Sequence, residues 1–197
     1  MSAWLHSILT AIEEWLLDYG VWGLILVSFT ESSFFPIIPD VVLIPLALAN
    51  PDSALLYALY TTLASAFGAI LGWFIGKKLG RPILQRFVSE KVIVKVEEYF
   101  EKYGSLSILI AGFTPIPYKV FTVFSGVSNM RISTLFFWSL LGRGIRFFLE
   151  AALIITLGEQ AWPFIENNFT IVTVTVAVVI IIGFVIYRSI LKRRSIV

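Results

Sequence analysis

Two prolines and a lysine inside an apolar segment constrain the fold of this chain most. The segment 104–127 is apolar enough for a membrane interior, but it contains Pro115, Pro117 and Lys119. Proline blocks a continuing helix and pushes the residue before it out of the helical region. Broken backbone survives in hydrocarbon only where protein buries it or water reaches it. We therefore expect a helix break here, and the ionisable Lys119 marks it as a candidate functional site.

An earlier apolar segment, residues 20–50, has the same character. It contains three prolines and two acids: Pro36, Pro39, Pro45, Glu31 and Asp40. The prolines cut it into pieces shorter than the roughly 20 residues that a helix needs to cross a bilayer. We expect a re-entrant hairpin with its break at residues 34–40, between two half-helices. Two ordinary short spans are the alternative.

The composition is that of an all-α membrane protein with a single domain, residues 1–197. The chain is 58% hydrophobic and 14% charged, whereas soluble domains carry about 25% charged residues. The net charge is only +2, and the basic residues lie in clusters, which argues against a nucleic-acid partner. The chain has no cysteine and therefore no thiolate metal site. We expect neither a metal nor a cofactor.

Helical periodicity predicts the remaining elements. Amphipathic surface helices are expected over residues 3–19 and 84–103, and long membrane helices over 53–76, 132–157 and 164–187. In the first long helix a glycine recurs at every fourth position, at Gly68, Gly72, Gly76 and Gly80. Such a face allows close approach of a neighbouring helix. Replacing Gly72 by leucine should therefore harm folding, whereas Ala69 is expected to lie off this face.

The two halves of the chain share one pattern. Residues 35–50 align without a gap with residues 114–129, so that Asp40 falls opposite Lys119. The repeats cover about residues 3–80 and 84–158, and the predicted helix over 164–187 follows them.

Basic residues indicate that the two repeats are inverted. Lysine and arginine are absent before Lys77 and between Arg146 and Arg188. Basic clusters stay on the cytoplasmic side, which places the N-terminus outside and the C-terminus inside. The halves then run in opposite directions as an inverted repeat with two opposed re-entrant hairpins, an arrangement typical of secondary transporters.

Six ionisable residues fall at membrane depth: Glu31, Asp40, Lys119, Arg143, Arg146 and Glu150. Arg143 lies about 18 Å along its helix from Arg131, near the expected midplane. An unpaired arginine there costs at least about 3 kcal/mol, so we expect partners for it. Mutual pairing as structural glue, for example of Arg143 with Glu150, is the alternative to a functional role.

Cations beside opened backbone form a place for an anion, and arginine favours phosphate. We expect Lys119, Arg143, Arg146 and Asp40 to bind a head group. Glu31, Asp40 and Glu150 are candidate proton carriers, because burial favours the protonated form of a carboxylate. The implied substrate is a phosphate-headed amphiphile moved between leaflets. A small anion or a drug-like cation, moved with protons, would suit the same cluster.

Three motifs carry a resemblance to a known family: Phe113-Thr-Pro-Ile-Pro-Tyr-Lys-Val-Phe-Thr, Ser125-Gly-Val-Ser-Asn-Met130 and Gly142-Arg-Gly-Ile-Arg-Phe147. Together they resemble the DedA family, the bacterial members of the VTT (SNARE-associated) superfamily, over about residues 15–160. The resemblance implies a multi-pass protein of the cytoplasmic membrane with two opposed re-entrant hairpins. It also implies a flippase or scramblase for a lipid such as undecaprenyl phosphate or phosphatidylethanolamine, with a homo-oligomer as a further expectation.

The resemblance also assigns residues. Glu31 and Asp40 match the acidic pair of the family's first hairpin, and Lys119 matches the second basic position of its R-F-x-P-x-x-R motif. Gly112 stands where many members have the first arginine. Two alternatives follow: either Arg143 and Arg146 replace it, or the head group is zwitterionic.

Two other classes of function remain as alternatives. An intramembrane enzyme such as a lipid phosphatase needs a nucleophile with a base, or a metal cluster. The apolar segments contain no histidine or cysteine, and we expect no enzyme. A non-transporting scaffold that maintains membrane integrity would tolerate neutral substitutions at Lys119 and Asp40.

Overall fold

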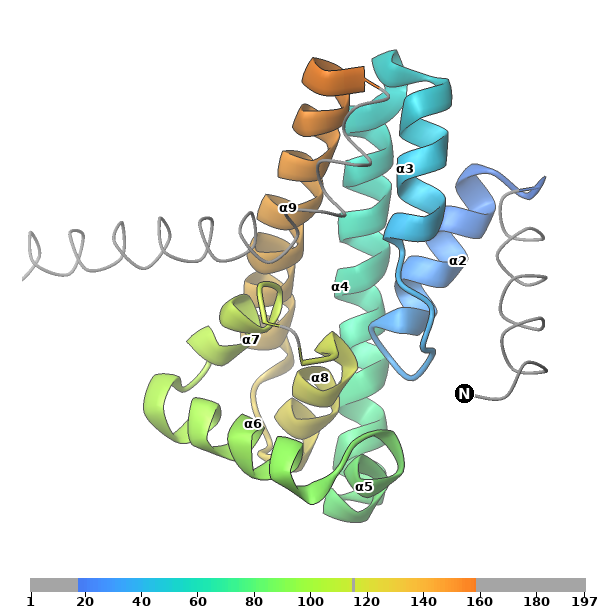
Figure 1. The fold of residues 1–197 in the computed structure, drawn as a ribbon. Coiled ribbons are helices and arrows are strands. Elements are labelled where there is room, and N and C mark those ends of the chain that lie inside the picture. The colour runs from blue at the N-terminus through green and yellow to red at the C-terminus, as the bar shows by residue number, and fades with distance from the viewer. Residues whose placement is uncertain (1–17, 115, 159–197) are drawn as a thin grey trace, which may run out of the picture.

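The computed structural model describes residues 18–114 and 116–158, which form helices and no β-strand (Figure 1). The predicted helices over 3–19 and 164–187 lie essentially outside these residues. The described helices are α2 (Val21–Glu31), α3 (Asp40–Ala49), α4 (Ala54–Leu79), α5 (Leu84–Phe87), α6 (Glu90–Tyr103), α7 (Leu106–Ala111), α8 (Tyr118–Val127) and α9 (Ile132–Leu157). Short 3-10 turns, η1 (Pro51–Ser53) and η2 (Arg81–Ile83), flank α4.

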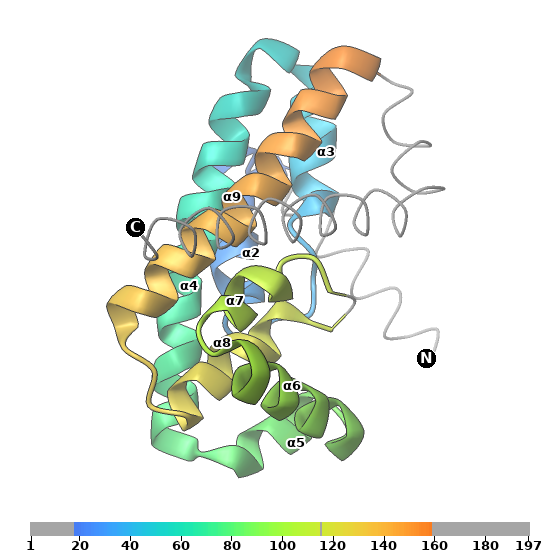
Figure 2. The ribbon, with the colours of Figure 1, turned by 90° about the vertical axis from the view of Figure 1, so that its left-hand side faces the viewer.

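Helix α4 is the centre of the fold, because α2, α3, α8 and α9 all pack against it (Figures 1 and 2). With η1 it forms the one described helix, Pro51–Leu79, that is long and apolar enough to cross a membrane by length and composition. Helix α9 is as long as α4, with 26 residues, but it carries three charged side chains: Arg143, Arg146 and Glu150. Both helices confirm the predicted bounds closely.

The predicted glycine face of α4 is confirmed at three of its four positions. A side chain at Gly68 would meet the backbone of Phe29 on α2, and one at Gly76 would meet the backbone of Val123 on α8. Gly80 instead ends the helix with a φ of +68°. Ala69 is also fully buried in the core, but burial alone does not place it on the glycine face, and its position off that face stays a prediction.

The first broken segment folds as helix, break and helix, as predicted. Residues 32–39, here called the first break, separate α2 from α3. Pro36 lies in the break and Pro39 directly precedes α3. Pro45, in contrast, lies inside α3 on its exposed side and does not interrupt the helix. The break is therefore made by two prolines rather than three, and it ends before Asp40.

The second broken segment follows the same plan. Helices α7 and α8 flank residues 112–117, the second break, with Pro117 directly before α8; Pro115 is outside the described residues. In Figure 1, α3 lies beside the upper half of α4 and α8 beside its lower half. The membrane re-entrance of the two helix pairs and the inverted repeat stay predictions.

The predicted surface helix over 84–103 is two helices. Val88 and Ser89 are extended, with ψ values of 164° and 157°. Serine favours this conformation at a helix start, and Glu90 in the first turn suits the helix dipole. Arg81 binds Glu90 at 2.6 Å and Glu97 at 3.0 Å, and so ties α6 to η2. Apolar periodicity did not reveal this bend because it continues across Val88.

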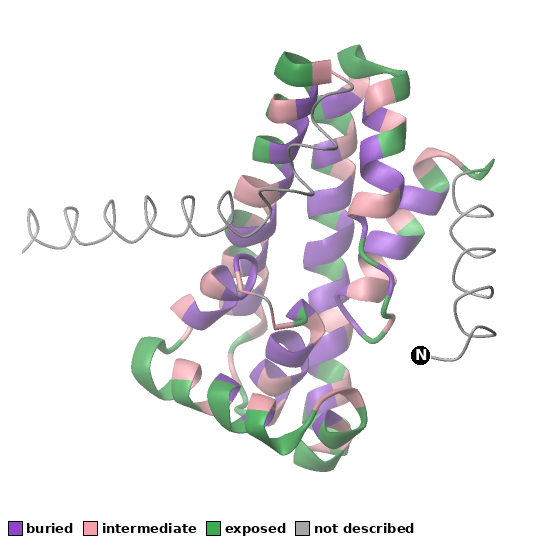
Figure 3. Ribbon diagram, viewed as in Figure 1, coloured by how far each residue is buried: buried purple, intermediate pink, exposed green. Residues whose placement is uncertain are grey.

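The core consists of two apolar clusters (Figure 3). One gathers residues of α2, α3, the start of α4 and the end of α9, including Phe147. The other gathers residues of the second half of α4, of α5 to α8 and of the start of α9, including Leu135. Arg143 lies between Leu135 and Phe147 along α9, so a charged layer separates the two clusters.

Candidate functional site

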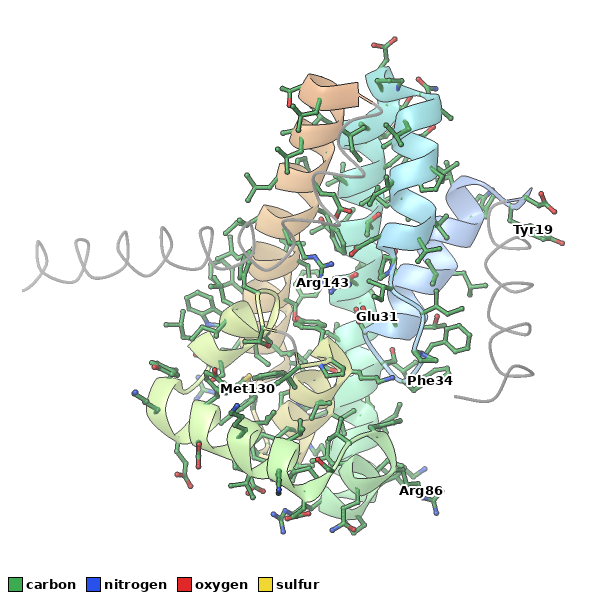
Figure 4. All side chains as sticks on the ribbon, in the orientation of Figure 1. Tyr19, Glu31, Phe34, Arg86, Met130 and Arg143 are labelled. Atoms are coloured by element: carbon green, nitrogen blue, oxygen red, sulfur yellow. The ribbon has the colours of Figure 1, made fainter. Side chains whose placement is uncertain are left out.

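Arg143 forms the centre of the buried charged layer (Figure 4). Its side chain is 1% exposed, and its Nη2 donates to Glu31 Oε2 at 2.7 Å. Nη2 also donates to the Ser65 hydroxyl on α4 at 3.2 Å. This one guanidinium therefore joins the end of α2, the middle of α4 and α9, elements far apart in sequence.

Aromatic rings fix the plane of the same guanidinium. The Arg143 Cζ lies 4.9 Å from the ring centroid of Tyr118 and 4.6 Å from that of Phe147. Stacked rings stabilise a cation and hold a planar guanidinium in one orientation. The Arg143 guanidinium therefore lies within cation–π distance of two aromatic rings.

Arg146 forms the second ion pair of the layer, with Asp40 Oδ2. Glu31 is the last residue of α2 and Asp40 is the first of α3, so the two carboxylates stand at the two ends of the first break. Their arginines are three residues apart on α9. Helix α9 therefore holds both ends of the first break by charge.

Glu150 lies one turn beyond Arg146 on α9 and is 8% exposed. Among the described residues, three buried side-chain atoms have no hydrogen-bond partner: Glu150 Oε1, Asp40 Oδ1 and Arg143 Nε. All three belong to what we call the ion-pair layer: Glu31, Asp40, Arg143, Arg146 and Glu150. Arg143 pairs with Glu31, and no Arg143–Glu150 ion pair occurs in the described part of the chain. The layer thus holds one donor and two acceptors without a hydrogen-bond partner among the described residues.

Lys119 of α8 lies against the first break. Its Nζ is 3.4 Å from the carbonyl oxygens of both Phe34 and Phe35. One turn along α8, the Thr122 hydroxyl donates to Ser32 O at 2.8 Å. The structure therefore brings Lys119 and Asp40 to the same break, but within the described residues they share no hydrogen bond. A polar cavity that both residues face stays a prediction.

Tyr118 is a site residue that the sequence analysis missed. Its hydroxyl donates to Ser139 Oγ at 2.6 Å, and its ring covers Arg143. A count from Phe113 gives the signal that was available: the last position of R-F-x-P-x-x-R falls on Tyr118, one residue before Lys119. The match of Lys119 to this position was therefore off by one. In the structure, the guanidinium of Arg143 lies against Tyr118, the residue at this last motif position.

Gly112 has a packing role. A Cβ at this position would lie 3.3 Å from the backbone of Gly142 on α9. A residue with a side chain, such as arginine, would therefore require a small shift of α7 away from α9. The close approach of these two helices accounts for glycine at this position.

Comparison with known proteins finds relatives that cover most of the chain. An uncharacterized protein of Haemophilus influenzae is 36% identical over 87% of this chain and 91% of its own length. An uncharacterized membrane protein of Bacillus subtilis is 29% identical over 75% of this chain and 94% of its own length. A Staphylococcus aureus protein named undecaprenyl phosphate transporter A is 24% identical over 94% of this chain and 98% of its own length.

No solved structure matches the chain. The VTT domain, the domain of the DedA family, matches residues 37–156, which include α3, both breaks in part or whole, and the arginines of α9. This match covers more than half of the chain, and relatives named as membrane proteins cover most of it. The chain is therefore a membrane protein and belongs to the VTT-domain (DedA) family.

Proposed function

We propose that this protein moves a phosphate-headed lipid between the leaflets of the cytoplasmic membrane. The observation that supports this most is Arg143, which is 1% exposed, bound to a carboxylate and still has an unpartnered Nε. A guanidinium in this setting suits a phosphate. The Staphylococcus aureus relative supports a transport role in general terms. We propose a polyprenyl phosphate or phosphatidylethanolamine as the lipid.

The proposed step is an anion exchange. In the described state, Glu31 and Asp40 occupy the two arginines of α9. A lipid phosphate that binds these arginines takes the place of the carboxylates, so that neither guanidinium is left unpaired in a low dielectric. The ends of the first break then lose their links to α9. Head-group binding and release of α2 and α3 thus become one event.

Proton coupling follows from the same exchange. A carboxylate without a counter-ion in an apolar interior is less costly when it is protonated. Glu31 and Asp40 would therefore take up protons as the phosphate displaces them, and Glu150 offers a third buried acid in the same layer. We propose Glu31 as the main proton carrier, because the position that aligns with it in the second half is not a cation.

A leaflet-transfer assay in liposomes tests this proposal. Wild-type protein is compared with Arg146→Gln, Lys119→Ala and Asp40→Asn, and with Arg86→Gln, an exposed arginine of α5, as the matched control. The probes are labelled undecaprenyl phosphate, phosphatidylethanolamine and a lipid with an uncharged head. Loss of one charge-assisted hydrogen bond, about 1.5–3 kcal/mol, predicts a transfer of phosphate lipids about 10- to 100-fold slower.

The same assay separates the alternatives. Equal rates for wild type and Lys119→Ala would show that the site is wrongly drawn and would favour a scaffold. Release of inorganic phosphate from the probe would indicate a lipid phosphatase, and proton-linked movement of small ions or drugs without lipid would indicate that class of transporter. Glu31→Gln should flatten the pH dependence of transfer while lipid binding persists.

A further inference from the structure

The carbonyl groups of the first break have a notable partner. Helix ends leave backbone oxygens without intrahelical partners, and the oxygens of Phe34 and Phe35 accept no backbone N–H among the described residues. The ammonium of Lys119 lies 3.4 Å from each of them. Two carbonyl oxygens of the break therefore have as their partner a cation that belongs to another helix.

Opened backbone carbonyls are typical ligands for a monovalent cation in transporters with broken helices. We propose that Lys119 is a built-in cation that stands where such a protein would bind sodium, and that removing its side chain creates a site for a free monovalent cation. This inference rests on the proposed function and adds that lipid transport by this protein does not need sodium. The cation site itself can be tested without any lipid.

Further contacts of Lys119 agree with a cation position. The ring centroid of Phe87 lies 5.5 Å from Nζ, which is within cation–π range. Ser32 O and the Thr122 hydroxyl add oxygen atoms close to the same break, 2.8 Å from each other. Phe34 is exposed and Lys119 is partly exposed, so protein atoms leave part of the surroundings of the ammonium open. An ammonium has three donors, which leaves one for a lipid head group.

The chemistry of the two cations decides the functional consequence. A free sodium ion binds and leaves, and so couples transport to the sodium gradient. A lysine ammonium cannot leave, but it supplies the same positive charge at every step. The wild-type protein should therefore fold and move lipid equally well in sodium, potassium or an organic cation that is too large for the site.

Thermal unfolding in detergent without added lipid tests the inference. Wild type, Lys119→Ala and Lys119→Ser are compared in sodium, potassium and N-methyl-glucamine chloride at constant ionic strength, with Lys95→Ala of α6 as an exposed control. We expect the midpoints of wild type and Lys95→Ala to be the same in all three salts. The two Lys119 variants should gain about 2–4 °C in sodium, in a saturable way. Lys119→Ser should gain at least as much, because it adds a hydroxyl ligand.

Two results would overturn the inference. One is a Lys119→Ala and Lys119→Ser pair whose midpoints do not depend on the cation, or that fail to fold in every salt. The other is a wild-type protein that sodium itself stabilises. Because the readout is stability, a protein that moves no lipid phosphate can still pass this test, and a true lipid transporter can still fail it.

Discussion

The two breaks share a sequence pattern, yet they are attached to α9 by different physics. The first break has a carboxylate at each end, and each carboxylate is bound by an arginine of α9. Within the described residues, the second break forms no ion pair with α9. It is held by the close approach of Gly112 and Gly142 and by the Tyr118–Ser139 hydrogen bond. One attachment is ionic, and the other combines close packing with a hydrogen bond between neutral groups.

This difference separates a part that a ligand can release from a part that it cannot. An anion can replace a carboxylate at an arginine, but no ligand replaces backbone packing between two glycines. Under the proposed anion exchange, a ligand would release α2 and α3 from α9, whereas α7 and α8 would keep their contacts. Three experiments can break or sharpen this contrast.

The largest effect concerns the side of the membrane from which each helix pair enters. The chain has no cysteine, so Asp52→Cys, beside α3, and Lys91→Cys, on α6, are single-cysteine proteins at exposed positions. We expect an impermeant thiol reagent to label Asp52→Cys only from outside and Lys91→Cys only from the cytoplasm. Labelling of both cysteines from the same side would contradict the predicted inverted repeat.

The next effect breaks the ionic attachment. Arg143→Gln leaves the partly buried Glu31 without its partner, and breaking such a pair should cost up to about 3–5 kcal/mol of unfolding free energy. The double variant Glu31→Gln/Arg143→Gln should cost less than Arg143→Gln alone. Arg81→Gln is the control, because Arg81 forms ion pairs at the surface and such pairs contribute about 0–1 kcal/mol. The idea of an ionic attachment fails if unfolding in detergent shows equal losses for Arg143→Gln and Arg81→Gln.

The smallest effect concerns the steric attachment. In Gly142→Ala the new Cβ would lie 3.1 Å from the backbone of Leu109 on α7, and we expect a loss of about 1 kcal/mol. At Gly144 a Cβ meets only a methyl group of Thr62, at 3.5 Å. Gly144→Ala should therefore leave stability unchanged or raise it by up to about 1 kcal/mol. Thermal midpoints in that order, with wild type between them, would support close packing of α7 on α9.

Much of the fold followed from local chemistry in the sequence. Prolines marked both breaks, since a proline acts on the backbone next to it. The period of glycines in α4 identified the packed face. The bounds of α9 followed from an apolar run between Arg131 and Gly158. Local rules failed at two places. Pro45 lies inside α3 without interrupting it. At Val88 the chain leaves α5 although the apolar period continues into α6.

The partners in the site were beyond local rules. The sequence identified Arg143, Arg146, Glu31 and Asp40 as a set, because unpaired charges in an apolar interior are costly. It did not specify which arginine meets which acid, because that depends on how α2, α3 and α9 pack against α4. The ring of Tyr118 over Arg143 escaped notice for the same reason, since a tyrosine in an apolar segment needs no charged partner.

The sequence distance between the charged partners has a consequence for biosynthesis. Glu31 precedes its arginine by 112 residues and Asp40 precedes its own by 106. At about 5–20 residues per second, the ribosome needs on the order of 5–20 s to reach α9 after it has made the first break. During that time both acids must stay protonated or in contact with water. The two ion pairs can therefore form only after α9 has been made, so that the first break reaches its final contacts late although it is synthesised early.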